Sequence, residues 1–112
     1  VLILGLAYKA DVGDTRESPT FELLERLVDL GAEVDYSDPH VPEMVPVRKS
    51  DRRLDGIELS PRVIASYDCV LIATAHSCVD WGQVAEHARL VVDTRDAMRS
   101  WRQEMGERLF MA

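Results

Sequence analysis

The 112-residue sequence has few cysteines, few basic residues and no long hydrophobic run, and each shortage excludes a class of protein. Its two cysteines, Cys69 and Cys78, are too few and too far apart for a disulfide framework or a zinc site, which makes a reducing cytoplasm the expected compartment. No apolar run approaches the roughly 18 residues of a membrane span, and no charged segment precedes a cleavable apolar stretch. We therefore expect neither a membrane partner nor a secreted disulfide scaffold.

Acidic residues outnumber basic ones, since 13 Lys and Arg against 20 Asp and Glu give a net charge of -7 at pH 7. This balance argues against a nucleic-acid partner or a patch for anionic lipids. With 46% hydrophobic and 29% charged residues, the composition is that of a globular chain with room for one core, so we expect a single domain over residues 1–112. It opens at Val1 with a strand-like apolar run and no initiator methionine, as a fragment of a longer protein would.

Apolar runs of strand length alternate with segments of helical periodicity along the chain. The pairs Ser18–Pro19 and Ser60–Pro61 each place a capping serine before a proline suited to the first helical position. Near-continuous apolar strands separated by helices indicate βαβ units with right-handed crossovers. The predicted fold is therefore an α/β, three-layer, doubly wound, mostly parallel sheet of Rossmann-like type. We expect strands at residues 1–4, 32–36, 57–59, 69–73 and 90–92, helices at 18–30, 60–66 and just after Trp81, and a closing helix in the amphipathic tail at 97–112.

Ligands of doubly wound sheets bind beyond the carboxyl ends of the strands, so the loops after Leu4, Ala73 and Val92 form the predicted site. The first of these loops does not carry the G-x-G-x-x-G dinucleotide fingerprint. Ala7 stands where the second glycine should be, and the helix begins only at about Pro19.

Three cations follow the predicted strands, with Lys9 and Arg16 in the first loop and Arg95 after the last strand. Lysine offers a flexible point charge and arginine a rigid fork, and the N-terminus of the helix after the first loop also favours anions. On an acidic protein these residues predict an anionic ligand. The alternative is that Lys9 and Arg16 are solvated loop charges paired with Asp11 and Asp14.

The histidines and cysteines form no catalytic or metal-binding pattern. Cys78 lies near His76, but no third orienting group is evident, and no histidines and cysteines have the spacing of metal ligands. Asp38 ends the second strand as the ribose-binding acid of a Rossmann unit would. It lies farther from Gly5 than the expected distance of about 20 positions, however, and a turn with Pro39 explains it equally well. We predict no catalytic residue and no metal site.

Four motifs identify a family that this chain resembles. They are G-L-A-Y-K-x-D-V-G-D-T-R-E-S-P, D-P-H-V-P-E, I-A-T-A-H and V-V-D-T-R, and they span most of the chain from Val1 to about Ala97. In this order they resemble the C-terminal, UDP-binding domain of the UDP-glucose/GDP-mannose dehydrogenase family. The D-P-H-V-P-E turn is most similar to the UDP-N-acetylglucosamine 6-dehydrogenase branch.

The resemblance implies a part of an enzyme of polysaccharide biosynthesis. Family members are cytoplasmic, NAD-dependent oxidoreductases that oxidise the C6 hydroxyl of a nucleotide sugar to a carboxylate through a covalent intermediate on a cysteine. The segments that hold this cysteine and the NAD fingerprint belong to the family's N-terminal half and are not in this sequence. We therefore expect the chain to bind a UDP-sugar beside the N-terminal domains, in a homodimer or larger homo-oligomer, and to be inactive alone.

The resemblance also assigns roles to four residues. Tyr8 and Lys9 match an aromatic-lysine pair that contacts the nucleotide sugar, and Arg95 matches a basic residue that contacts the same substrate. Arg16 matches the arginine that reaches NAD from this domain. Lysine and arginine can neutralise diphosphate charge, which suits these roles. The competing hypothesis is a stand-alone α/β interaction module with no nucleotide ligand.

Overall fold

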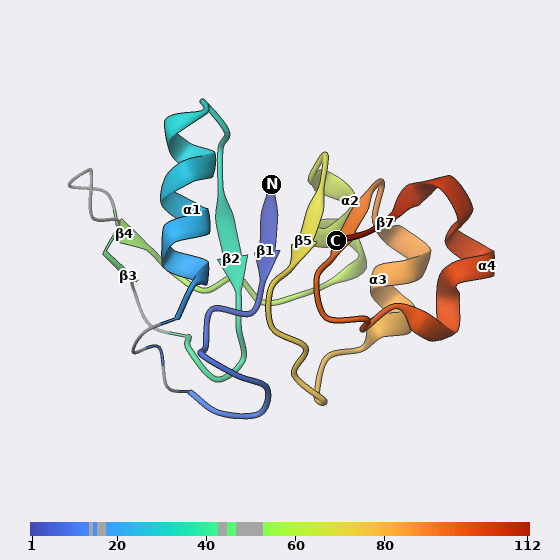
Figure 1. The fold of residues 1–112 in the computed structure, drawn as a ribbon, viewed down its shortest axis with the longest axis horizontal. Helices are drawn as coiled ribbons and strands as arrows, with labels where there is room; N and C mark the ends of the chain where they lie inside the picture. The colour runs from blue at the N-terminus through green and yellow to red at the C-terminus, as the bar shows by residue number, and fades with distance from the viewer. Residues whose placement is uncertain (14, 16–17, 43–44, 47–52) are drawn as a thin grey trace.

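The computed structural model describes residues 1–13, 15, 18–42, 45–46 and 53–112. Five strands form one sheet in which every neighbouring pair is parallel, in the order β2-β1-β5-β6-β7. In Figure 1 the arrows of β1, β2 and β5 run from the end near the N-terminus toward a shared edge of loops. The predicted α/β, mostly parallel, Rossmann-like fold is confirmed. The strands are β1 (Leu2–Leu4), β2 (Asp35–Ser37), β5 (Val70–Ile72), β6 (Val91–Asp93) and β7 (Leu109–Met111).

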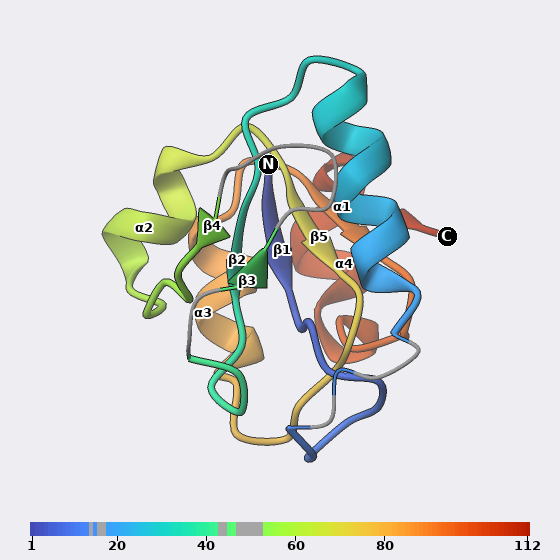
Figure 2. The same ribbon diagram turned by 90° about the vertical axis from the view of Figure 1, so that its left-hand side faces the viewer.

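Helices cover both faces of the sheet and complete the three layers (Figure 1). Helix α1 (Thr20–Asp29) packs on one face, and α2 (Pro61–Ser66), α3 (Trp81–His87) and α4 (Arg102–Met105) pack on the other. Figure 2 shows α1 on one side of the strands and α2 and α3 on the other. Among the described residues, no helix has both the length and the apolar character needed to cross a bilayer.

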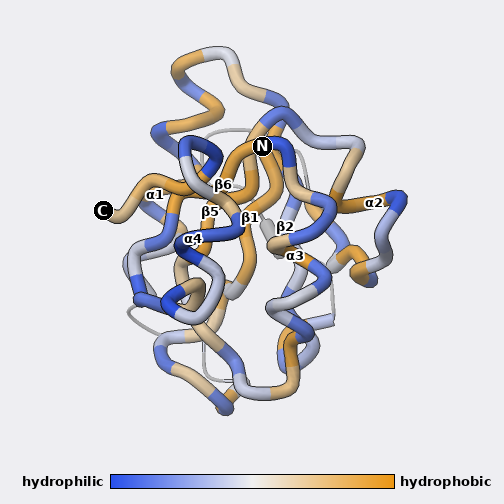
Figure 3. Tube along the Cα trace, turned by 90° about the vertical axis from the view of Figure 1, so that its right-hand side faces the viewer, coloured by the Kyte–Doolittle hydropathy of each residue, from blue (hydrophilic) through white to orange (hydrophobic). Residues whose placement is uncertain are grey.

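The central strands β1 and β5 supply residues to two hydrophobic cores. Successive strand residues point to opposite faces, so Ile3 joins the core under α1 with Leu24 and Tyr36, while Leu2 and Leu4 join the core under α2, α3 and α4. Figure 3 shows the hydrophobic strands behind the more hydrophilic α4. This two-sided burial explains why β1 and β5 are apolar throughout rather than alternating.

Local capping signals define where the helices begin. The Ser60 hydroxyl accepts a hydrogen bond from the N–H of Val63 at 3.1 Å, with proline at the first position of α2, as the sequence predicts. The same expectation is wrong for α1, which begins at Thr20 with Pro19 at its N-cap position rather than at its first helical position. The Ser18 hydroxyl instead accepts from the N–H of Thr20 at 3.4 Å. The Asp80 carboxylate caps α3 through the N–H of Gln83.

Two expected elements are wrong. The tail from 97 to 112 is not one closing helix, because α4 ends at Met105. Gly106 follows with a φ of +54°, which favours glycine, and after one 3₁₀ turn the chain forms the edge strand β7 against β6. Residues 57–59 form no strand. Gly56 makes an isolated parallel bridge to Tyr36, after the antiparallel pair β3 (Val45–Pro46) and β4 (Arg53–Leu54).

Candidate functional site

The loops after β1, β2 and β5 meet at the carboxyl edge of the sheet, at the bottom of Figure 1. The chain leaves β1 toward β2 and later returns to β1's other side as β5, so the winding reverses at β1. Ligands of such sheets bind in the crevice outside this reversal. The loops after β1 and β5, two of the three in which the sequence predicts the site, flank this reversal.

The loop after β1 turns tightly against the loop after β5 at Gly5. This residue has a φ of +93°, and a Cβ atom on it would lie 2.4 Å from Cβ of Thr74. The Thr74 hydroxyl donates to the carbonyl of Ala7 at 2.9 Å, which fastens the two loops together. Only glycine fits this close approach.

Asp38, at the end of β2, is the acceptor that shapes the start of this loop. It is buried, and its Oδ2 accepts hydrogen bonds from the N–H groups of Leu6 at 2.7 Å and Ala7 at 3.0 Å, while Oδ1 accepts from the N–H of His40 at 2.8 Å. Burial works against ionisation of the carboxyl, but hydrogen bonds from His76 and from these three backbone N–H groups outweigh it. They hold the pKa of Asp38 below its ordinary value.

These contacts limit what the loop can bind. In a dinucleotide fingerprint the amides of the first turn face a pyrophosphate. Here the Leu6 and Ala7 amides already donate to Asp38. A diphosphate at this edge would therefore need donors other than these two amides, and the predicted cations can supply them.

His76 joins all three loops. Its ring is 1% exposed, its Nε2 lies 2.9 Å from Asp38 Oδ2, and its Nδ1 accepts a hydrogen bond from the N–H of Asp11 at 2.8 Å. The Asp11 carboxylate accepts from the N–H of Ser77 at 2.7 Å and from its hydroxyl at 2.9 Å. The backbone N–H of Ser77 and then its hydroxyl lower the pKa of Asp11. The sequence analysis missed this network, although Asp38 and His76 both follow predicted strands.

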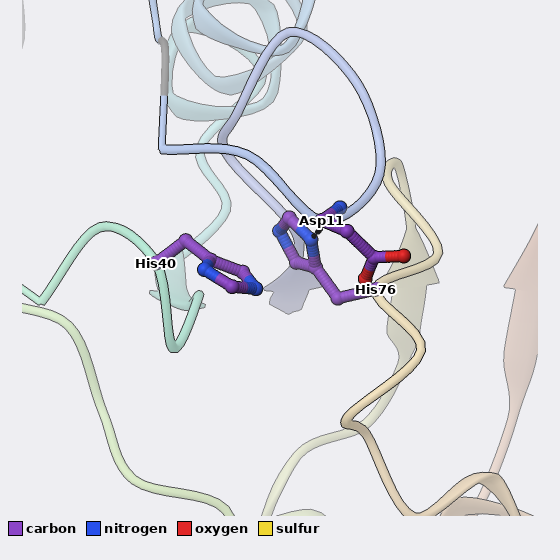
Figure 4. A group of neighbouring side chains, drawn as sticks. All are labelled: Asp11, His40 and His76. Carbon is purple, nitrogen blue, oxygen red and sulfur yellow. Dashed lines mark hydrogen bonds between the residues drawn. The ribbon is translucent and has the colours of Figure 1, made fainter.

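The same cluster also has the outline of an ion site. Asp11, His40 and His76 can each offer a ligand atom, and these atoms lie within 4.8 Å of one another (Figure 4). Both ring nitrogens of His76 are engaged in hydrogen bonds within the protein, however, and an imidazole needs a free lone pair to bind a metal. We therefore interpret the cluster as a hydrogen-bond network.

The structure brings three of the four predicted site residues to this edge. Tyr8 and Lys9 are exposed on the loop after β1, with half of the Tyr8 surface accessible. Arg95 follows β6, is exposed, and donates from Nε to the carbonyl of Ala73 at 2.9 Å. The loop of Lys9 and the side chain of Arg95 are thus bonded to consecutive residues, Thr74 and Ala73. Arg16 lies outside the described residues.

Arg95 is held at its base by a buried carboxylate. Asp93 is fully buried, and it accepts hydrogen bonds from the N–H of Arg95 and the N–H of Met98, both at 2.9 Å. Among the described residues Arg95 has no salt-bridge partner, whereas Arg102 pairs with Asp96 at 2.8 Å. The charge of Arg95 is therefore available to an anion at this edge.

A cavity of about 480 Å³ opens beside the network, between the end of β2 and the start of α3. Neither Tyr8, Lys9 nor Arg95 lines it. The thiol of Cys78 is at its wall, 3.9 Å from Nε2 of His40. The cavity therefore lies beside the predicted cations rather than between them.

Comparisons with known proteins agree with this architecture. Residues 2–100 match the family model for the UDP binding domain of the UDP-glucose/GDP-mannose dehydrogenase family. The chain is 28% identical over 105 residues to a UDP-glucose 6-dehydrogenase of Rickettsia bellii and 34% identical over 99 residues to UDP-glucose 6-dehydrogenase AglM of Haloferax volcanii. These matches cover 89% and 88% of this chain but only 24% and 20% of those proteins. The chain thus spans about a quarter of the length of the curated relatives it matches.

Solved structures give the same result. A UDP-D-ManNAc dehydrogenase from Pyrococcus horikoshii superposes with a TM-score of 0.62 at 28% identity, over 86% of this chain and 21% of that one. A GDP-mannose dehydrogenase from Pseudomonas aeruginosa gives a TM-score of 0.65 over 98% of this chain and 27% of that one, and at 20% identity it supports the fold alone. On the family match, the parallel fold and the loop motifs together, the chain belongs to the UDP-binding-domain family of the UDP-glucose/GDP-mannose dehydrogenases.

Proposed function

We propose that this chain is the UDP-sugar-binding domain of an NAD-dependent nucleotide-sugar 6-dehydrogenase, with UDP-N-acetylglucosamine or UDP-glucose as the substrate. The whole enzyme oxidises the C6 hydroxyl of the sugar to a carboxylate. The observation that carries the proposal is the bonding of the Lys9 loop and of Arg95 to the same segment, Ala73–Thr74, at the carboxyl edge of the sheet. The family match supplies the ligand class.

Each side chain has a role that its chemistry suits. Lys9 supplies a mobile positive charge and Arg95 a planar fork, and both bind diphosphate oxygens. Tyr8 offers a ring face and a hydroxyl to the nucleotide or the sugar. The net charge of -7 belongs to the whole surface, so the ligand meets a local cationic edge of an acidic domain.

The chain supplies binding rather than chemistry. NAD accepts the hydride in this class of reaction, but the described residues do not fit the main site of that cofactor, because the Leu6 and Ala7 amides are occupied by Asp38. We assign the NAD fingerprint and the cysteine nucleophile to the rest of the enzyme, with Arg16 reaching NAD from this domain. The isolated chain is therefore inactive.

The surroundings follow from the same proposal. Neighbouring N-terminal domains close over the edge that carries Lys9 and Arg95, and the assembled enzyme is a homodimer or larger homo-oligomer. A cytoplasmic location suits the two cysteines, Cys69 and Cys78, which are both free thiols.

Calorimetric titration of the chain with UDP tests the proposal. Lys9→Ala and Arg95→Ala should each weaken binding by about ten- to a hundredfold, the cost of one charge-assisted contact. Arg89→Ala is the matched control, because Arg89 is exposed at the opposite edge of the sheet, where it pairs with Asp68. Equal effects of all three variants, or no binding of millimolar UDP by the wild type, would favour an interaction module without a nucleotide ligand.

A further inference from the structure

The loop that carries Tyr8 and Lys9 contains no helix or strand of its own between Gly5 and Gly13. Its conformation depends on groups from other segments. The first half is held by Asp38 and Thr74, through the backbone of residues 6 and 7. The second half is held at Asp11, where φ is +63°, by the loop after β5. Tyr8 and Lys9 lie between these two anchors.

Among the described residues, only His76 is hydrogen-bonded to both anchors. It contacts the backbone of Asp11 in the second half of the loop and the carboxylate of Asp38, which holds the first half. Nδ1 meets the N–H of Asp11 at 2.8 Å, and Nε2 meets Oδ2 of Asp38 at 2.9 Å. With 1% of its side chain exposed, the ring has no room to rotate into solvent. Through His76 the two anchors share one rigid support.

The two partners fix the proton of this ring. An amide N–H can only donate, so Nδ1 must present its lone pair to Asp11. The proton of the neutral ring is then on Nε2, where the Asp38 carboxylate accepts it. A second proton on Nδ1 would face the Asp11 amide and remove that bond. The support therefore depends on one tautomer of the uncharged ring.

We propose that His76, as its neutral Nε2–H tautomer, is a positioning residue that holds the loop in the form in which Tyr8 and Lys9 bind the UDP-sugar. This inference rests on the proposed function for the identity of the ligand. His76 itself lies beneath the loop and is not a catalytic residue.

Groups from three segments enclose the ring. Asp38 faces it from the end of β2, Asp11 from the loop after β1, and the His40 ring lies 4.5 Å away between centroids.

Two substitutions separate the two contacts of the ring. Asparagine places its side-chain oxygen near the position of Nδ1, so His76→Asn keeps an acceptor for the Asp11 amide. Glutamine places its amide nitrogen near the position of Nε2, so His76→Gln keeps the donor to Asp38 and loses that acceptor. His87→Asn, at the end of α3, is the matched control.

Nuclear magnetic resonance of the chain provides the readouts. In the wild type, ¹⁵N shifts of the imidazole should report the Nε2–H tautomer. In His76→Gln, hydrogen exchange at the Asp11 amide should accelerate by roughly tenfold, the factor for one lost hydrogen bond, and UDP should bind severalfold more weakly. His76→Asn should exchange at Asp11 more slowly and bind UDP more tightly than His76→Gln, and His87→Asn should retain wild-type exchange and wild-type affinity.

An Nδ1–H tautomer, or equal effects of His76→Asn and His76→Gln, would overturn the inference. If a variant does not fold, the tautomer in the wild type decides alone. If Lys9→Ala weakens UDP binding and His76→Gln does not, the positioning role fails while the proposed function stands. If the wild type binds no UDP but exchange at Asp11 follows the predicted pattern, the proposed function fails and the support of the loop by His76 stands.

Discussion

Replacing Asp38 tests whether the buried network stabilises the carboxyl edge. The carboxylate accepts three backbone N–H groups and the His76 ring, so Asp38→Ala leaves four donors without this acceptor in a buried site. Removing one partner of a buried charged network costs about 3–5 kcal/mol, a large part of the roughly 5–15 kcal/mol that holds a domain of this size together. Asp38→Asn should cost less, about 1–3 kcal/mol, because the amide keeps one acceptor oxygen and turns an NH₂ group toward the remaining donors.

Urea unfolding at pH 7 measures these costs, with Asp68→Asn as the control. Asp68 has 96% of its side chain exposed, so its substitution should stay within about 0.5 kcal/mol of the wild type. If Asp38→Ala also stays within about 0.5 kcal/mol, the network does not stabilise the edge and the reasoning is refuted.

The sign of the pH dependence gives a second check on Asp38. Its pKa is lower in the folded chain than the ordinary value of about 3.9, so its ionisation stabilises the fold fully above that value. This stabilisation is lost as the pH falls through the folded pKa. The difference in unfolding free energy between wild type and Asp38→Asn should therefore shrink at pH values below about 4. A difference that grows in acid would contradict the assignment.

Three further predictions concern the fold around the site. Gly5→Ala should cost at least about 3 kcal/mol of unfolding free energy, because the added Cβ meets the loop after β5. Gly31→Ala is the control, because Gly31 has a similar φ of +91° but a Cβ atom there would have no neighbour within 4 Å, and it should cost only about 1–2 kcal/mol. Equal costs for the two variants would show that the contact at Gly5 does not affect stability. Ser60→Ala should cost about 1 kcal/mol in the same assay through loss of the α2 cap, and no change would exclude the cap. Burial and then Asp35 raise the pKa of Tyr67, so absorbance titration should find it protonated above pH 10, whereas ionisation near pH 10 would refute that contact.

Local signals predicted most of the fold. Ser60–Pro61 carries its own start signal, and α2 begins where that signal indicates. The apolar strands are recognisable because burial on both faces leaves no polar alternation. The tail was different, since Leu109 and Phe110 fit a helical stripe as well as a strand. The segment becomes the strand β7 because it pairs with β6, which is distant in sequence.

The site was predictable only in part for the same reason. Lys9 and Arg95 lie in the loops that follow apolar strands, so the parallel topology alone brings them to one edge. The network of Asp11, Asp38 and His76 joins three loops through hydrogen bonds between residues far apart in the chain. No spacing rule connects them. In the sequence, a turn with Pro39 explains Asp38, Asp11 counts as a loop charge, and His76 draws notice only beside Cys78. The hydrogen bonds among these three residues become evident only in the folded sheet, where the strand ends lie side by side.

A titration of the ¹⁵N-labelled chain with UDP, followed by nuclear magnetic resonance, tests the central claim most directly. If the carboxyl edge is the nucleotide-sugar site, the backbone signals of Tyr8, Lys9 and Arg95 shift together with one dissociation constant, and the double variant Lys9→Ala/Arg95→Ala loses the response. Signals that stay unchanged at this edge up to millimolar UDP, or that shift only around Arg89 at the opposite edge, would contradict the claim.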